Sequence, residues 1–204
     1  MTALRLHALW RGSCPLLGDS LFVWAQGCPR RCKGCFNTGA LDESGPALRR
    51  RPSTVARRWA HRGGGLVLSG GEPFLQAEGL AELCRQVRAL APDAPILTYT
   101  GYLLEDLLAG GGPGWLDLLR QTDVLVDGPY HEEIPSPLAL LGSGNQRVFF
   151  LSGRVEAARL ASMPPVQVQA DLDGRGRVRL VGTGDIDMRR LVVAMKSQGL
   201  ELEE

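Results

Sequence analysis

Short apolar runs recur along the chain, and polar or glycine-containing stretches separate them. Apolar runs of this length, bounded by turn residues, are typical of buried β-strands. They predict strands at residues 21–25, 66–68, 96–99, 124–126 and 148–151. Most of these strands are followed directly by residues that favour turns, which define where those strands end.

Segments with helical spacing lie between the predicted strands. Pro52 and Ser53 open one helix, because proline is favoured in the first turn. After the second strand, apolar residues recur at i, i+3, i+4 and i+7, which predicts a helix with one apolar face. These apolar residues are Leu80, Leu83, Cys84 and Val87. Weaker helical segments are expected around 103–108, 115–119 and 155–160.

The pattern changes near the C-terminus. Apolar and polar residues alternate at 166–170 and again at 178–180, on either side of a polar turn at 171–176. A period of two on both sides of a turn predicts an antiparallel hairpin. A final helix is expected from near Asp185 to Gly199, with the aspartate as N-terminal cap and the glycine as stop.

Strands that alternate with helices predict an α/β fold with a mainly parallel sheet. A closed eight-unit barrel takes about 31 residues per strand–helix unit, so this chain has room for five or six units. We therefore expect an incomplete TIM-like β/α barrel of five or six parallel strands, followed by the C-terminal antiparallel hairpin and helix. Residues 1–204 are predicted to form one domain, with its core at about 18–151 and the hairpin and helix at about 165–199.

The charge balance excludes some classes of partner. The 204 residues include 23 basic and 22 acidic ones, which gives a net charge of +1. Such a chain has no electrostatic basis for binding nucleic acid or an anionic membrane without specificity, so neither is expected as a partner. Charged residues interrupt the N-terminal apolar pattern, and no uncharged apolar run reaches the roughly 18 residues of a membrane span. We expect a cytoplasmic protein.

Three of the five cysteines stand close together: Cys28, Cys32 and Cys35, in the stretch GCPRRCKGCFN. An odd number of cysteines in a reducing compartment argues against a disulfide framework. Several thiolates from one short loop are what an iron–sulfur cluster requires. Three thiolates leave one iron of a four-iron cluster without a cysteine ligand. An open coordination position is typical of catalytic metal sites, so this spacing favours a catalytic cluster.

The cysteines have other conceivable roles. A structural zinc site takes four ligands, in paired knuckles or with nearby histidines, and the three histidines of this chain lack that spacing. Cys84 lies on the apolar side of its helix, so it is expected in the core rather than as a fourth ligand. Cys14 precedes Pro15 in a predicted early loop and has no assigned role.

Chemically distinctive residues also follow the later strands. SGGEP occupies 69–73, TGY occupies 100–102 and DGPY occupies 127–130, and GNQRV at 144–148 leads into the last strand. The carboxyl ends of parallel strands meet at one edge, where such folds build their active sites. Two glycines at a strand-to-helix turn can also bind phosphate, but the carboxylate of Glu72 would repel it.

Together these stretches resemble a known family. The C-x3-C-x2-C spacing after the first strand looks like the cluster loop of radical S-adenosylmethionine (SAM) enzymes, and SGGEP looks like their SAM-recognition motif. The stretches CFN, YTGY, VDGPY and GNQRV occur in the order expected for the glycyl-radical-enzyme activases, including those of anaerobic ribonucleotide reductase. The resemblance covers roughly residues 18–151.

The resemblance implies roles for individual residues. Cys28, Cys32 and Cys35 would bind three irons of one 4Fe-4S cluster, and SAM would chelate the fourth. Glu72 would accept a hydrogen bond from the SAM amine. The residues implied to contact SAM are Gly34, Phe36, Gly70, Gly71, Glu72, Thr100, Gly101, Asp127 and Asn145.

Some of these assignments have equal alternatives. The backbone of Gly70 and Gly71 is expected to approach the methionine part of SAM closely, because glycine has no side chain. Ordinary turn chemistry explains Thr-Gly and Asp-Gly sequences equally well, without a ligand. Asn145, with its neighbours Gln146 and Arg147, could equally cap the preceding loop or bind the partner's glycine loop.

The resemblance also implies a reaction: reductive cleavage of SAM to methionine and a 5′-deoxyadenosyl radical, which takes a Cα hydrogen from a glycine of a partner enzyme. The expected partners are a glycyl radical enzyme, in the first place anaerobic ribonucleotide reductase, and a low-potential electron donor such as flavodoxin or ferredoxin. The cofactor carries the difficult chemistry, so no catalytic acid or base is assigned. The alternatives are a radical SAM enzyme that modifies a small molecule or peptide, as deazapurine-forming members do, and a non-enzymatic iron–sulfur or zinc module.

Two surface features complete the prediction. The proline-interrupted loop at 131–144 is expected to be the cover that moves when the partner's glycine enters. The arginines at 49–51, 57, 58 and 62 form a dense basic patch. A solvated face is favoured for this patch over a docking site for an acidic electron donor.

Overall fold

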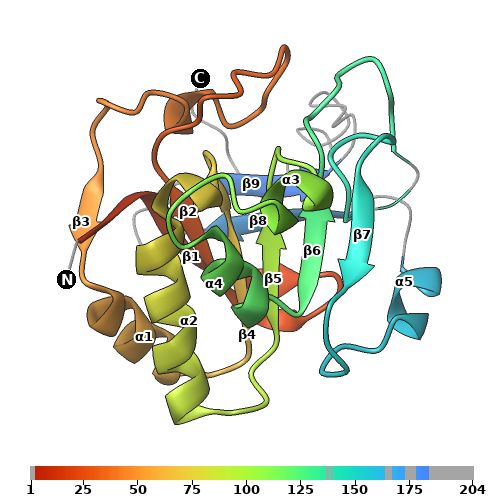
Figure 1. Cartoon of the computed structure of the whole chain (residues 1–204). Coiled ribbons are helices and arrows are strands. Elements are labelled where there is room, and N and C mark those ends of the chain that lie inside the picture. Colours follow the sequence, from red (N-terminus) through yellow and green to blue (C-terminus); the bar gives the residue numbers. More distant parts are fainter. Residues whose placement is uncertain (1–2, 137, 139, 164–166, 173–177, 184–204) are drawn as a thin grey trace.

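Seven strands form one mixed sheet in the order β3-β1-β2-β4-β5-β6-β7, and β8 and β9 pair separately (Figure 1). The structure, a computed structural model, describes residues 3–136, 138, 140–163, 167–172 and 178–183. The strands of the large sheet are β1 (Leu4–Cys14), β2 (Gly18–Ala25), β3 (Leu48–Arg50), β4 (Gly65–Gly70), β5 (Ile96–Tyr99), β6 (Val124–Asp127) and β7 (Arg147–Phe150). The helices are η1 (Thr38–Ala40), α1 (Pro52–Ala60), η2 (Pro73–Gln76), α2 (Ala77–Leu90), α3 (Leu104–Leu108), α4 (Trp115–Gln121) and α5 (Ala158–Ala161).

The centre of the sheet is parallel and its edges are antiparallel. The strands β2, β4, β5 and β6 run parallel to one another, whereas β1 and β3 run antiparallel to their neighbours and β7 runs antiparallel to β6. The prediction of five or six parallel strands is therefore wrong for the described residues, which contain four. The strand predicted at 148–151 returns from β6 through a loop without a crossover helix, so it lies antiparallel. The incomplete barrel remains a prediction.

The first strand, β1, was missed because its charged residues disguise the alternation. Leu4, Leu6 and Trp10 are buried along it, while the positions between them are partly exposed. A bulge between Leu6 and Ala8 shifts the register and breaks the period of two. The short edge strand β3 is exposed throughout, so it carries no hydrophobic signal.

Two apolar cores lie on the two faces of the sheet. Since successive residues of a strand point to opposite faces, Leu66 and Leu68 pack under the helices α1, α2, α3 and α4, while Val67 faces the other way. The second core is closed by a segment of the loop before β7, with Leu140 and Leu141, and by Val155. Figure 1 shows α2, α3 and α4 in front of the sheet and β8 and β9 behind it.

The two cysteines outside the cluster of three are core residues. Cys84 is fully buried on the inner side of α2, as predicted, and burial raises the pKa of its thiol to about 12. Cys14 is the last residue of β1 rather than part of a loop, and it packs in the second core. Burial raises the pKa of the Cys14 thiol as well.

The predicted hairpin is present as β8 (Gln167–Leu172) and β9 (Val178–Thr183), which pair antiparallel with Ala170 opposite Leu180. The helix expected at about 185–199 lies outside the described residues. Within the described parts of the chain, no helix has both the length and the apolar character needed to cross a membrane.

Candidate functional site

The loop that follows β2 holds Cys28, Cys32 and Cys35. Its ends are fixed by backbone hydrogen bonds from Gly27 N–H to Ala40 O (2.8 Å) and from Cys28 N–H to Leu41 O (3.1 Å). Cys28 is buried, while Cys32 and Cys35 are half-buried, and all three are free thiols. The cysteine loop, residues 26–37, thus presents its thiols at the edge of the sheet where the parallel strands end.

Sharp turns shape the cysteine loop. Arg31, at φ 45°, is the one non-glycine residue with positive φ in the described part of the chain, and Gly34 has φ 70°. Non-glycine residues rarely adopt a positive φ. The few that do so are found preferentially in loops that position functional groups. A side chain at Gly34 would also meet the carboxylate of Glu132, because a Cβ there would lie 2.5 Å from its Cδ.

The donor set of this loop fits an iron–sulfur cluster. Among the described residues, no three His, Cys, Asp or Glu side chains come close enough together to bind a single metal ion. A four-iron cluster asks for less, because each thiolate binds its own iron. Burial raises the pKa of the Cys28 thiol, while backbone N–H groups of Arg30 and Arg31 act in the opposite direction. These N–H groups would stabilise the thiolate that a metal ligand must become.

Glu72, at the turn after β4, joins two of the predicted motifs. Its Oε1 accepts hydrogen bonds from Phe74 N–H (3.0 Å) and the Thr100 hydroxyl (2.9 Å), and its Oε2 accepts one from Gly101 N–H (2.8 Å). Burial raises the pKa of this carboxyl, and these hydrogen bonds partly oppose the shift. The structure therefore brings together Glu72, Thr100 and Gly101, as the sequence predicted.

The Glu72 carboxylate has no cation within 4 Å among the described residues. The Arg30 guanidinium acts on this carboxyl from beyond that distance and forms no ion pair with it. A buried carboxylate without an ion pair favours a ligand that carries an ammonium group. From the described residues its Oε2 accepts one hydrogen bond, so it can accept another. The amine of SAM fits this position.

The two glycines before Glu72 are explained by packing within the protein. A Cβ on Gly71 would lie 2.2 Å from the carbonyl oxygen of Gly27, and a Cβ on Gly70 would lie 2.7 Å from the backbone of Trp24 and Ala25. Gly70 also has φ 98°. The turn after β4 can therefore lie against the base of the cysteine loop only if both positions are glycine. The predicted approach of these glycines to SAM remains a prediction.

Asp127 and Asn145 make contacts with the protein that the sequence did not reveal. Arg147 donates to both carboxylate oxygens of the buried Asp127, from Nε (2.9 Å) and Nη2 (2.5 Å), and Leu104 N–H donates to Oδ2 (2.7 Å). Asn145 Nδ2 donates to the carbonyl oxygen of Pro129 (2.8 Å). The loop-capping alternative is therefore present for these residues, and their contact with SAM remains a prediction.

Gln146 completes this arrangement. Its Nε2 donates to the Gly128 carbonyl (3.0 Å), while its Oε1 accepts from Gly142 N–H (2.8 Å) and Ser143 N–H (3.2 Å). Three consecutive residues, 145–147, thus bind three consecutive residues, 127–129, in reverse order. We call this set of contacts the clasp. It closes the base of the loop between β6 and β7.

The loop that the clasp closes packs on the cysteine loop. Phe36 meets the ring of Tyr130 edge to face, with centroids 5.2 Å apart. Phe36 nevertheless keeps 61% of its surface exposed. The sequence did not predict that Tyr130 and Glu132 contact the cysteine loop. Both residues follow the predicted strand at 124–126 closely, and this position was the signal that could have indicated the contacts.

Comparison with known proteins agrees with this geometry. Residues 17–149 match the 4Fe-4S single cluster domain, and the chain belongs to this family of iron–sulfur proteins. Its relatives include anaerobic ribonucleoside-triphosphate reductase-activating proteins. That of Enterobacteria phage T4 is 30% identical over 138 residues, which cover 65% of this chain and 84% of the relative.

Cellular relatives carry the same name. The protein of Vibrio cholerae is 32% identical over 143 residues, covering 63% of this chain and 86% of the relative. The protein of Escherichia coli is 28% identical over 142 residues, covering 66% and 90%. The resemblance to reductase activases that the sequence motifs suggested is thereby confirmed.

Proposed function

We propose that this protein is a radical SAM enzyme that generates a glycyl radical on anaerobic ribonucleotide reductase. The observation that carries the proposal is the pairing of two features at neighbouring strand ends. Three free thiols lie on the loop after β2, and a buried carboxylate that forms no ion pair with a described residue lies at the turn after β4. Glu72 N–H donates to Gly27 O (2.8 Å), which ties the two turns together.

In this proposal each element of the site has a task. Cys28, Cys32 and Cys35 hold the cluster, and Glu72 holds the amine of SAM. When bound, the reduced cluster and SAM supply a one-electron cleavage that leaves methionine and a 5′-deoxyadenosyl radical, which takes a Cα hydrogen from a glycine of the partner. The Thr100 hydroxyl and Gly101 N–H orient the Glu72 carboxylate. The contact of Phe36 with Tyr130 joins the cysteine loop to the clasped loop.

The partners follow from the same proposal. The relatives are named as activating proteins of anaerobic ribonucleoside-triphosphate reductase, and we assign that reductase as the partner of this chain. Cleavage of SAM consumes one electron per turnover. A low-potential protein such as flavodoxin or ferredoxin is the proposed donor.

Anaerobic reconstitution with iron and sulfide tests this function. We expect about four irons per chain, release of 5′-deoxyadenosine from SAM after reduction, and a glycyl radical doublet in electron paramagnetic resonance when the reductase is added. One tightly held zinc ion in place of iron would favour the non-enzymatic module. Release of 5′-deoxyadenosine without a radical on the reductase would favour chemistry on a small molecule or peptide.

A further inference from the structure

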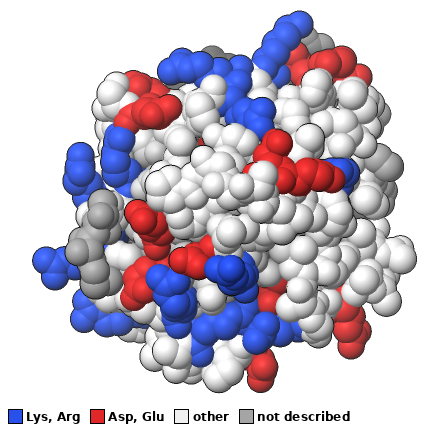
Figure 2. Space-filling view, in the orientation of Figure 1, with Lys and Arg blue, Asp and Glu red and all other residues white. Residues whose placement is uncertain are grey.

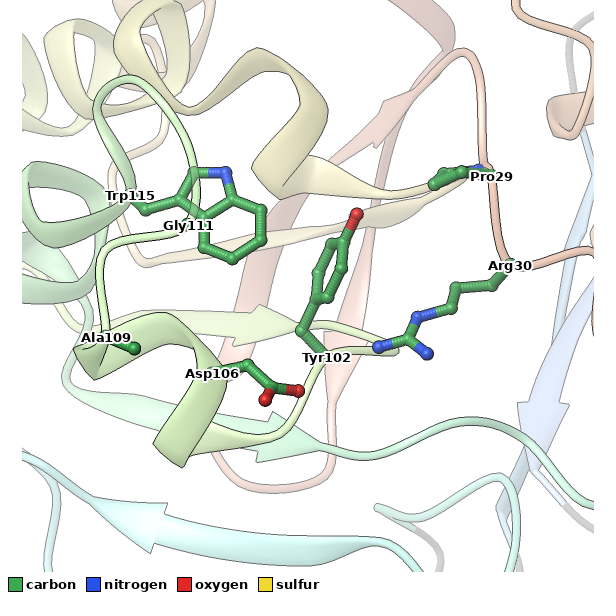
Figure 3. Close-up of a pocket in the computed structure, with 7 residues that line it drawn as sticks. All are labelled: Pro29, Arg30, Tyr102, Asp106, Ala109, Gly111 and Trp115. Carbon is green, nitrogen blue, oxygen red and sulfur yellow. The ribbon is translucent and has the colours of Figure 1, made fainter.

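An open groove of about 550 Å³ lies beside the cysteine loop (Figure 3). Its walls come from the cysteine loop itself, from the turn after β5, and from α3 with the loop that leads to α4. The residues that line it are Pro29, Arg30, Tyr102, Asp106, Ala109, Gly111 and Trp115. Of these residues Arg30 is coupled to the proposed SAM site, because its charge lowers the pKa of the Glu72 carboxyl. Because Pro29 and Arg30 directly follow Cys28, whatever occupies the groove adjoins the cysteine loop.

The aromatic wall of the groove is preformed. Trp115 Nε1 donates to the carbonyl oxygen of Phe74 (3.0 Å), and its ring packs against Tyr102 with centroids 4.6 Å apart. A Cβ on Gly112 would lie 2.5 Å from Trp115 Nε1, so the glycine-rich loop can rest on the indole only without a side chain there. A wall that is already ordered costs little entropy when a ligand binds.

Arg30 is a cation of this groove that forms no ion pair within the described part of the chain, although its charge acts on Glu72 from beyond 4 Å. Its guanidinium lies over the Tyr102 ring, 4.5 Å from the centroid, as Figure 3 shows. No described carboxylate lies within 4 Å of it and no described residue accepts a hydrogen bond from it, whereas Arg88 and Arg147 each bind a buried aspartate. The ring orients the guanidinium, and its N–H groups are available for an incoming carboxylate.

The shape and composition of the groove fit a protein segment. Tryptophan, tyrosine and arginine are the residue types that dominate binding energy at protein interfaces. In Figure 2, a broad uncharged band crosses the face that carries α2, α3 and α4, with charges of both signs around it. An incoming chain would therefore meet an uncharged surface next to the aromatic wall and the Arg30 guanidinium. Asp106, on the other side of Tyr102, disfavours an acidic group at that end.

We propose that this groove docks a segment of the reductase that carries an acidic side chain, which Arg30 binds, next to apolar side chains, which Tyr102 and Trp115 contact. The inference rests on the proposed function, because the reductase is the partner whose glycine must reach the cysteine loop. Docking in the groove aligns that partner beside the loop without contacting the cysteines.

The test uses reconstituted protein reduced with dithionite, which removes the need for a protein donor. Two readouts are measured: 5′-deoxyadenosine released without reductase, and the dissociation constant of the reductase complex, with the reductase concentration that gives half-maximal glycyl radical. We expect Arg30→Glu to weaken reductase binding about thirtyfold, as for loss of an interface hot spot. Release of 5′-deoxyadenosine without reductase is measured for each variant, because Arg30 belongs to the cysteine loop and its charge acts on Glu72, and the dissociation constant of the reductase complex decides the docking. The dissociation constant of Arg30→Lys for the reductase should lie between those of the wild type and Arg30→Glu.

Arg57→Glu is the matched control, since Arg57 is also a cation without a described ion-pair partner and lines a second groove, between α1 and α2. Wild-type binding of the reductase by Arg57→Glu is expected. The docking proposal is overturned if Arg30→Glu binds the reductase as wild type does, or if both arginine variants weaken it equally.

Two further outcomes distinguish a failure of the docking proposal from a failure of the proposed function. If Arg30→Glu impairs only reduction by a flavodoxin while activation with dithionite is normal, the groove belongs to the electron donor and the docking proposal is wrong. If the wild-type protein releases no 5′-deoxyadenosine, the proposed function fails. The binding constants of the Arg30 and Arg57 variants for the reductase then decide the groove alone.

Discussion

Arg147, the first residue of β7, joins the buried carboxylate of Asp127 at the end of β6 to the exposed carboxylate of Glu105 on α3. The two contacts to Asp127 are matched by two to Glu105, from Nη1 (3.0 Å) and Nη2 (2.7 Å). Arg147 holds the pKa of the Glu105 carboxyl at about 2. One guanidinium therefore fixes the loop after β6 and the helix after β5 together.

Loss of this guanidinium should destabilise the protein. In Arg147→Ala, the Asp127 carboxylate stays buried without its cation, and removing one partner of a buried pair is costly. We expect the denaturation midpoint in urea to fall clearly. Arg147→Lys should recover part of it, because lysine supplies the charge without the two-pronged geometry.

Glu105→Gln is the control for the exposed half of this network. Surface pairs contribute little to stability, so its midpoint should stay close to that of the wild type. A midpoint for Arg147→Ala no lower than that of Glu105→Gln would contradict the importance of the buried contact.

Affinity for SAM should depend on the ionisation of Glu72. Burial raises the pKa of this carboxyl above its usual range, and an ammonium ligand binds the ionised form. As pH falls through the raised pKa, the carboxyl takes up a proton in the free protein, so SAM binding must weaken on the acidic side. Equilibrium dialysis of reconstituted protein from pH 8 downward measures this trend.

Glu72→Gln provides the matched comparison. This variant keeps a hydrogen-bond acceptor but has no group that titrates there, so its weaker binding should lose the acid-side dependence. Equal pH profiles for wild type and Glu72→Gln would show that another group governs binding.

Alanine at Gly70 should cost more stability than alanine at Gly18 or Gly153. Gly70 combines φ 98° with a Cβ position 2.7 Å from neighbouring backbone, and we expect a loss of about 3 kcal/mol in the free energy of unfolding. Gly18 has φ 72° with open space, which predicts about 1 kcal/mol.

Gly153→Ala completes the series. Gly153 has neither a positive φ nor a neighbour within 4 Å, so its change should stay within about 0.5 kcal/mol. Chemical denaturation of the three variants gives the order directly, and an equal cost at all three would refute the packing explanation.

The cysteines divide into two groups that iron analysis can separate. Cys28→Ala, Cys32→Ala and Cys35→Ala should each lose the cluster absorbance and SAM cleavage after reconstitution. Cys84→Ala should keep both, since Cys84 is fully buried in the core behind α2. Full iron content in any of the first three variants would contradict the ligand assignment.

Much of the central sheet could be predicted because its strands are strong apolar runs. The predicted strand at 96–99 matches β5, and the other four overlap β2, β4, β6 and β7. β1 was missed because charged residues occupy its partly exposed positions and a bulge interrupts the alternation. The antiparallel pairing of β7 with β6 could not be predicted. An apolar run does not indicate whether a strand pairs parallel or antiparallel, because the path of the preceding loop decides this.

The site was predicted in part for a similar reason. The convergence of Glu72 with Thr100 and Gly101 follows from parallel strands that end at one edge. Loop capping by residues 145–147 was one of the alternatives that the sequence offered, but the partners of the clasp could not be predicted, because they depend on how the loop between β6 and β7 folds back. Sequence reasoning placed Asp127 among the SAM contacts, while its carboxylate is bound by Arg147.

The clasp also has a consequence for folding. Strands β6 and β7 are joined by a long loop, whose closure costs entropy, and a slip of one residue would turn Val126 and Val148 away from the second core. Three side chains that each recognise a different backbone or carboxylate partner accept a single alignment. The contacts at 145–147 therefore select the native register of β6 and β7 against shifted pairings.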